Sequence, residues 1–171
     1  MNKPTSQDAL AVMKFGIGQP VPRQEDPILV RGEGRYTDDL NVDGQLYAVF
    51  VRSPHAHGVL RGIDTAAALA VKGVVAVYTG ADLAAAGYGP LKCVLPFKSR
   101  DGSPLVQPPR GALATDKVRF VGDPVAVVVA KTVAAARDGA EAVALDIETL
   151  PAVVRPLDAL APGAPQLYED A

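Results

Sequence analysis

The sequence feature that most constrains the fold is a Val-rich apolar run from Pro124 to Ala130. The run follows a Gly-Asp-Pro turn, ends at Lys131 and contains no charged residue. This pattern is typical of a strand that is buried on both faces. We therefore expect this strand to lie at the centre of a sheet, with its middle at residues 125–129.

A helix and a second strand follow this run directly. Thr132 supplies an N-cap oxygen, and spacings of three and four place on one helix face Ala136, Ala140, Val143 and Ala144. Gly139 in this helix costs about 1 kcal/mol relative to Ala. Residues 145–150 alternate and stop at Pro151, as a strand does. Because a helix joins the two strands, we predict that they are parallel, with a right-handed crossover.

The first half of the chain shows a similar alternation of strands and short helices. Strands are predicted at residues 45–53, 58–63 and 74–79, and helices at residues 66–71 and 82–86. Asp64 or Thr65 is placed to cap the first helix. The expected fold class is α+β, a mixed sheet with strand–helix–strand units and a long Pro-rich loop.

The N-terminal and C-terminal segments show little periodicity. We expect residues 1–14 to be a flexible tail, and residues 15–40 to be an extended arm of a single domain that spans residues 15–171. This arm has few apolar residues to anchor it, so we expect it to be mobile in the isolated chain and ordered in a complex. Near the C-terminus, one helical turn is expected at residues 157–161.

Residues 88–116 form a long segment that we call the Pro-rich loop. Its five prolines prevent long regular elements, and they are Pro90, Pro96, Pro104, Pro108 and Pro109. A loop of this length in a compact domain is usually functional or contacts a partner. Between Lys92 and Arg119 six cations stand against two acids. This charge indicates either a solvated surface or a contact with an acidic partner.

Composition and cysteine content exclude several classes of protein. The net charge of −2 implies no general attraction to nucleic acid or to a membrane surface. No run approaches the roughly 18 apolar residues of a membrane span. The single cysteine, Cys93, forms no internal disulfide and cannot supply the four ligands of a typical iron–sulfur cluster. A reducing cytoplasm is the expected location.

The sequence contains few candidate catalytic or metal-binding residues. His55 and His57 lie two apart and face the same side of an extended chain, but a zinc site needs a third and usually a fourth ligand. Their alternative role is structural, as rings that hydrogen-bond to backbone. Arg52 either fixes a turn or clamps a neighbouring domain. No nucleophile, base and orienting group can be assembled from this sequence.

Four segments in order resemble one known domain. They are PVPRQEDPILVRGEGRYTDDL, LYAVFVRSPHAHGVLRGID, GVVAVYTGADL and VRFVGDPVAVVVAKTVAAARDGAEAVALDIETLPAVV. Residues 17–171 thereby resemble the N-terminal α/β hammerhead domain of the molybdenum-binding subunit of xanthine dehydrogenases, aldehyde oxidases and aerobic carbon monoxide dehydrogenases. The most specific pieces are RSPHAH at residues 52–57 and VGDPVA at residues 121–126.

The resemblance implies a domain that packs against the domains or subunit holding a molybdopterin-type molybdenum cofactor. Iron–sulfur and flavin (FAD) subunits are the further partners that it implies. None of the family's catalytic, cofactor-binding or metal-binding residues matches a position here, so none is assigned. The candidate interdomain docking residues are Arg52, Ser53, Pro54, His55, His57, Gly122, Asp123 and Pro124.

The chain departs from the family's pattern in two short motifs and in length. The family usually has Glu where Asp123 stands, and a Tyr-Glu pair at residues 147–148. Family members also continue for several hundred residues beyond this domain. The chain is therefore expected to be a separately encoded or truncated hammerhead domain, inactive alone. The alternative is a free-standing module that binds a ligand or another protein through its Pro-rich loop.

Overall fold

The computed structural model describes residues 23–92, 94–95 and 97–169. The chain divides into two compact units, Met1–Asp43 and Gly44–Ala171. In the first unit, the described residues form helix α2 (Asp26–Leu29) and the 3₁₀-helix η1 (Thr37–Asp39). The predicted tail at residues 1–14 lies outside the described residues, and the mobility of the arm stays a prediction.

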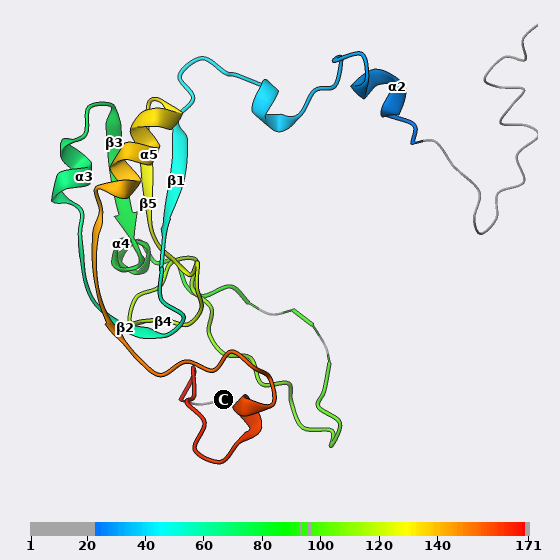
Figure 1. The fold of residues 1–171 in the computed structure, drawn as a ribbon, viewed down its shortest axis with the longest axis vertical. Coiled ribbons are helices and arrows are strands. Elements are labelled where there is room, and N and C mark those ends of the chain that lie inside the picture. The colour runs from blue at the N-terminus through cyan, green and yellow to red at the C-terminus, as the bar shows by residue number, and fades with distance from the viewer. Residues whose placement is uncertain (1–22, 93, 96, 170–171) are drawn as a thin grey trace, which may run out of the picture. The chain divides into compact units, whose positions relative to one another are not determined.

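The first sheet of the second unit is built around the Val-rich run. Strand β5 (Pro124–Ala130) lies between β1 (Tyr47–Arg52) and β3 (Val74–Thr79), and both pairings are antiparallel (Figure 1). The central position predicted for this strand is confirmed. Its neighbours hydrogen-bond to it on both edges, so its backbone groups are paired without a parallel partner.

The second sheet has the order β4-β2-β6, and its pairings are also antiparallel. It consists of β4 (Lys117–Val118), β2 (Gly58–Asp64) and β6 (Ala144–Thr149). The predicted parallel pairing of the strands before and after the long helix is therefore wrong. Both edges of β5 are already occupied by β1 and β3, so β6 leaves that sheet and pairs with β2.

Three helices connect the two sheets. Helix α3 (Ala66–Ala70) begins after Asp64, whose Oδ1 accepts a hydrogen bond from the backbone N–H of Ala66 at 2.9 Å. Helix α4 (Gly80–Ala85) has a capping box formed by Thr79 and Asp82. The capping box marks the start of α4, whereas the N-cap position of α3 is Thr65, whose side chain makes no capping hydrogen bond.

Helix α5 (Val133–Glu141) follows β5 and begins at the predicted cap, since Thr132 Oγ1 accepts from the backbone N–H of Ala135 at 3.1 Å. The helix ends at Glu141, so Val143 and Ala144 do not belong to its predicted inner face. Its buried residues are Ala135, Ala136 and Gly139. A Cβ on Gly139 would lie 2.8 Å from Val74 Cγ2 and 2.9 Å from Val128 Cγ1. Glycine therefore permits the close contact between helix and sheet, besides lowering helix propensity.

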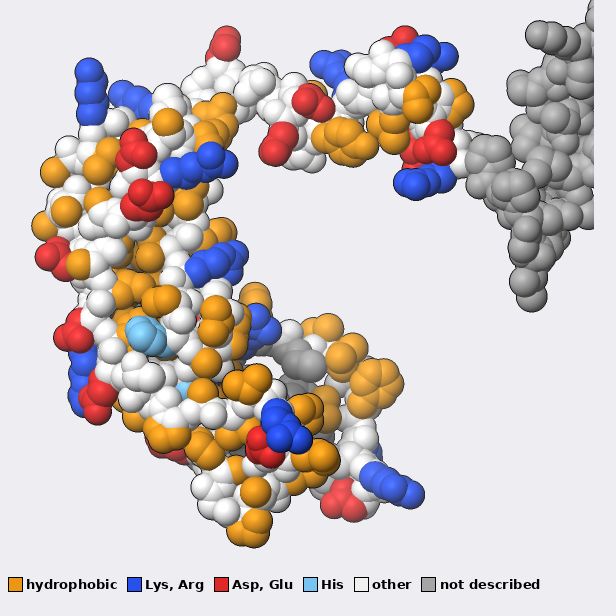
Figure 2. Space-filling model, in the orientation of Figure 1, with side chains coloured by type: hydrophobic (Ala, Val, Ile, Leu, Met, Phe, Trp, Pro, Cys, Tyr) orange, Lys and Arg blue, Asp and Glu red, His pale blue; other side chains and the backbone are white. Residues whose placement is uncertain are grey.

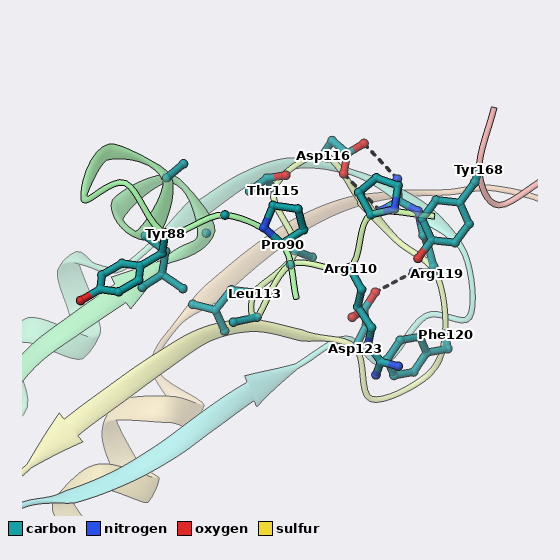
Figure 3. A pocket seen from close by; sticks show the side chains of 18 residues that line it. Tyr88, Pro90, Arg110, Leu113, Thr115, Asp116, Arg119, Phe120, Asp123 and Tyr168 are labelled. Carbon is teal, nitrogen blue, oxygen red and sulfur yellow. Dashed lines mark hydrogen bonds and ion pairs between the residues drawn. The ribbon is translucent and has the colours of Figure 1, made fainter. Parts of the chain in front are cut away.

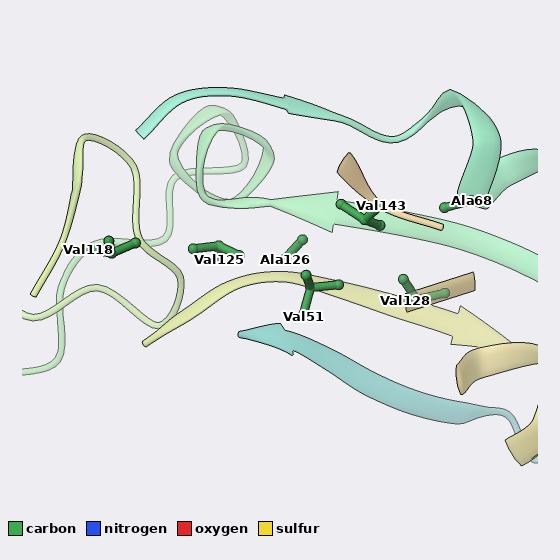
Figure 4. Packing of buried hydrophobic residues seen from close by; sticks show 7 residues of the cluster. All are labelled: Val51, Ala68, Val118, Val125, Ala126, Val128 and Val143. Atoms are coloured by element: carbon green, nitrogen blue, oxygen red, sulfur yellow. The ribbon is translucent and has the colours of Figure 1, made fainter. Parts of the chain in front are cut away.

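The core is aliphatic. Val118, Val125 and Val128 are the largest fully buried side chains, and the cluster in Figure 4 adds Val51, Ala68, Ala126 and Val143. Val118 comes from the second sheet and Val125 from the first. The core therefore joins the two sheets.

The segments outside the sheets contain little regular structure. The Pro-rich loop contains no named helix or strand among its described residues, and the 3₁₀-helix η2 (Asp158–Leu160) lies within the helical turn predicted near the C-terminus. Among the described residues, no helix is long and apolar enough to cross a membrane.

Candidate functional site

The two motifs that the sequence singles out meet in space. Residues 52–57 follow β1, residues 122–124 lead into β5, and Arg52 stands opposite Pro124 in the pairing of these strands. The backbone N–H of Ser53 donates to the carbonyl of Asp123 at 2.9 Å, and the N–H of Gly122 donates to the carbonyl of Ser53 at 2.8 Å. We call residues 52–57 together with 122–124 the β1–β5 junction.

Arg52 closes this junction from outside. Its Nη1 donates to the carbonyl of Gly122 at 2.9 Å, and its guanidinium lies 5.5 Å from the ring centroid of Phe50. Gly122 has φ +89°, a left-handed conformation that favours glycine. The geometry thus supports the first of the two roles considered for Arg52, fixation of a turn.

Ser53 holds the turn between β1 and β2. Its side chain is buried, and its Oγ accepts from the backbone N–H of His55 at 3.0 Å and donates to the His55 carbonyl at 2.9 Å. A serine hydroxyl that bonds backbone two residues ahead stabilises a local turn. Ser53 is therefore a structural residue of the junction.

The two histidines contact different residues near the end of β6, so their rings do not converge on one point. His57 is only 4% exposed, and its Nδ1 lies 2.8 Å from the carbonyl oxygen of Pro151. Because a carbonyl only accepts, Nδ1 carries the ring proton and donates it. The ring of His55 contacts Thr149 through Nδ1 and Oγ1 at 3.4 Å. Within the described part of the chain, the buried Nε2 of His57 has no hydrogen-bond partner.

A pocket of about 340 Å³ adjoins the junction, and sequence reasoning missed it. It lies between α4, the end of the Pro-rich loop and the turn before β5, and its lining includes Tyr88, Arg110, Arg119, Phe120 and Tyr168 (Figure 3). The turn residue Asp123 also lines it, and its Oδ2 accepts from the backbone N–H of Arg119 at 2.9 Å. No periodicity or spacing in the sequence groups these residues.

Arg119 organises one wall of this pocket. Its guanidinium bonds the two carboxylate oxygens of Asp116 at 3.2 and 3.1 Å and the carbonyl of Leu167 at 3.0 Å, and it lies 4.5 Å from the ring of Tyr168. Burial raises the pKa of Asp116, but the hydrogen bonds and charge of Arg119 outweigh it, so the net pKa lies below the usual value. The Arg119 charge is thus already balanced within the chain.

The described residues do not form a metal centre. Among them, no group of three or more His, Cys, Asp or Glu side chains is arranged to hold a metal ion, and Cys93 lies outside the described residues. An iron–sulfur cluster typically needs four thiolates, and the sequence contains one cysteine. Among the described residues, the hydrogen bonds of the junction join it to neighbouring backbone, so the observed role of its side chains is structural.

Comparison with known proteins identifies similar chains. The family described as "Aldehyde oxidase and xanthine dehydrogenase, a/b hammerhead domain" matches residues 31–151, a range that includes all six strands. The nicotine 6-hydroxylase large subunit of Paenarthrobacter nicotinovorans is 45% identical over 82% of this chain and 16% of its own length. The carbon monoxide dehydrogenase large chain of Afipia carboxidovorans is 39% identical over 98% of this chain and 19% of its own length.

Two further comparisons add a subunit type and a structure. The xanthine dehydrogenase molybdenum-binding subunit of Escherichia coli O157:H7 is 37% identical over 81% of this chain and 18% of its own length. The solved structure of CO dehydrogenase from Oligotropha carboxidovorans superimposes with a TM-score of 0.73 at 39% identity, over 91% of this chain and 18% of that chain. The chain thus spans less than a fifth of the length of these relatives.

Proposed function

Because the chain belongs to the a/b hammerhead domain family of aldehyde oxidase and xanthine dehydrogenase, we propose that it serves as the hammerhead domain of a molybdenum hydroxylase. The observation that carries this proposal is the family match across both sheets. In the assembly, the chain packs against the domains or subunit that hold the molybdenum cofactor. Iron–sulfur and FAD subunits complete the complex, which we place in the cytoplasm.

The role of this chain's own residues in that assembly is structural. The polar groups of Ser53, Gly122 and Asp123 bond one another or neighbouring backbone, so they set the geometry of the β1–β5 junction. We assign no catalytic step to them. The molybdenum cofactor, when bound by the neighbouring part of the hydroxylase, supplies the oxidation–reduction chemistry.

The exposed residues of the junction are the ones that can contact a neighbouring domain. Ser53 and His57 are buried, so they act by holding the turn in place. Arg52 and Pro54 are exposed and lie beside it. We propose that these two residues contact the neighbouring domain, while the buried ones determine where they point.

Recovery of the chain from its native host through an affinity tag tests the proposed function. Intact mass spectrometry and molybdenum and iron analysis of the eluate are the measurements. We expect a larger polypeptide of the same family together with both metals. Elution of the chain without such a polypeptide and without molybdenum would overturn the proposal.

A further inference from the structure

The Pro-rich loop folds back on itself. Asp101 closes its tip, because its Oδ1 accepts from the backbone N–H of Ser103 at 3.0 Å and from its hydroxyl at 2.7 Å. Behind this tip, antiparallel bridges join two pairs of residues, which are Lys98 with Pro104 and Leu91 with Arg110. These bonds and bridges hold the two sides of the loop together.

The loop exposes several large apolar side chains. Val94 is 86% exposed and Phe97 is 65% exposed. Figure 2 shows hydrophobic side chains gathered over the loop, and the large exposed ones among its described residues are Tyr88, Leu91, Val94, Leu95, Phe97, Leu105 and Val106. A contiguous exposed apolar patch marks a binding surface more often than a solvated one.

The cations of the loop lack carboxylate partners. Among the described residues, no ion pair involves Lys92, Lys98, Arg100 or Arg110. The cations that follow the loop are different, since Lys117 pairs with Glu169 and Arg119 pairs with Asp116. We call the exposed apolar residues of the loop and its four unpaired cations the loop face. Its composition, exposed apolar side chains with four cations against the single acid Asp101 between residues 92 and 110, suits a complementary surface that carries carboxylates beside apolar side chains.

We propose that the loop face is the main docking surface of this domain. Its occupant is a surface of the molybdenum-cofactor-binding part of the hydroxylase that carries Asp and Glu side chains around an apolar patch. This inference rests on the proposed function, because that part of the protein is the occupant it names. Two observations favour it: the loop face has unpaired positive charge, and the relatives are at least five times as long as the region that this chain matches.

Site-specific photo-cross-linking in the native host tests the occupant. A benzoylphenylalanine replaces Phe97 in the full chain, and in a control it replaces Val75, which is 50% exposed on β3. We expect peptides cross-linked to position 97 to come from a molybdenum hydroxylase sequence beyond residues 1–171, in a segment that contains acidic residues. Cross-links to a second copy of residues 1–171, or to lipid, or only from position 75, would overturn the proposal.

Charge reversal separates the docking surface from the proposed function itself. The double substitution of Lys98→Glu and Arg100→Glu should weaken retention of the molybdenum-containing polypeptide about tenfold and reduce its dependence on salt. Lys72→Glu with Lys131→Glu makes the same charge change at exposed sites outside the loop and should leave retention unchanged. Equal effects of the two pairs would overturn the loop face as the docking surface. If the unmodified chain retains no such polypeptide, the proposed function itself fails.

Discussion

The β1–β5 junction and the loop face contain similar residue types, but their side chains differ in whether they have partners within the chain. In the junction, the Arg52 guanidinium donates to the Gly122 carbonyl, and the Ser53 hydroxyl donates to and accepts from the backbone of His55. In the loop face, Arg100 has no ion-pair partner among the described residues, and Phe97 is mostly exposed. A polar group that is satisfied inside the chain contributes to stability, whereas one left unpaired at the surface is available for binding.

Loss of the buried histidine should have the largest effect on folding. His57→Ala removes the hydrogen bond to Pro151 and leaves a cavity, so we expect the free energy of unfolding to fall by about 3 kcal/mol. Urea denaturation of the free chain measures this change. His55→Ala is the matched control, because that ring is partly exposed and makes only a 3.4 Å contact, and it should cost under about 1 kcal/mol. Equal losses of unfolding free energy in the two variants would show that the buried His57 ring stabilises the junction no more than His55 does.

Removal of one hydroxyl compares the two regions directly. Ser53→Ala deletes both bonds to the His55 backbone at a buried position, and we expect a loss of about 1.5 kcal/mol. Ser103→Ala makes the same chemical change at the exposed tip of the loop and should cost under about 0.5 kcal/mol. Thermal or urea unfolding of both variants checks the difference. A larger cost at Ser103 would reverse the comparison.

The ion pair of Arg119 should titrate in acid. Burial raises the pKa of Asp116, but the bonds from Arg119 lower it by more than burial raises it. The folded pKa therefore lies below the unfolded value of about 3.9. Such a carboxylate stabilises the fold above its unfolded pKa, and this contribution is lost as the pH falls through the folded pKa. We expect a loss under about 1 kcal/mol below about pH 4.

The ring resonances of Tyr168, which lies over Arg119, report this transition by NMR. Asp116→Asn should abolish the pH dependence below about pH 4 while leaving the resonances of the junction in place. An unchanged titration in Asp116→Asn would assign the transition to another carboxylate.

Local signals predicted much of the fold. The Val-rich run predicted the central strand, and the Thr132 oxygen predicted the cap of α5 that the structure confirms. These predictions succeed because a strand or a cap depends on a few neighbouring residues. Of the two alternatives for α3, Asp64 or Thr65, the structure places Thr65 at the N-cap position without a side-chain cap. The parallel pairing failed because the edges of β5 are taken by β1 and β3, which lie far away in the sequence. Helix propensity alone predicted that Gly139 destabilises the helix, whereas in the fold a Cβ at this position would collide with Val74 and Val128.

The candidate site was predictable only in part. Ordered motifs indicated the family, and comparison with known proteins confirms it. The motifs also named Arg52 and Gly122, which the structure brings into contact. The pocket around Arg119 was missed, since Tyr168 is far from it in the sequence and no periodicity links the two residues. A docking role for the junction residues stays a prediction.

The smallest expected effect on folding belongs to the loop face. Phe97→Ser should change the free energy of unfolding of the free chain by less than about 0.5 kcal/mol, because the ring is 65% exposed and loses few contacts on substitution. Val128→Ala, at a fully buried position, is the matched control and should cost about 2 kcal/mol. Urea denaturation measures both values. A cost for Phe97→Ser that approaches the control would mean that the ring stabilises the domain itself, and the contrast between a hydrogen-bonded junction and an exposed loop face would fail. A negligible cost, together with weaker retention of the molybdenum-containing polypeptide, would mean that the ring is exposed because its contacts lie on the partner.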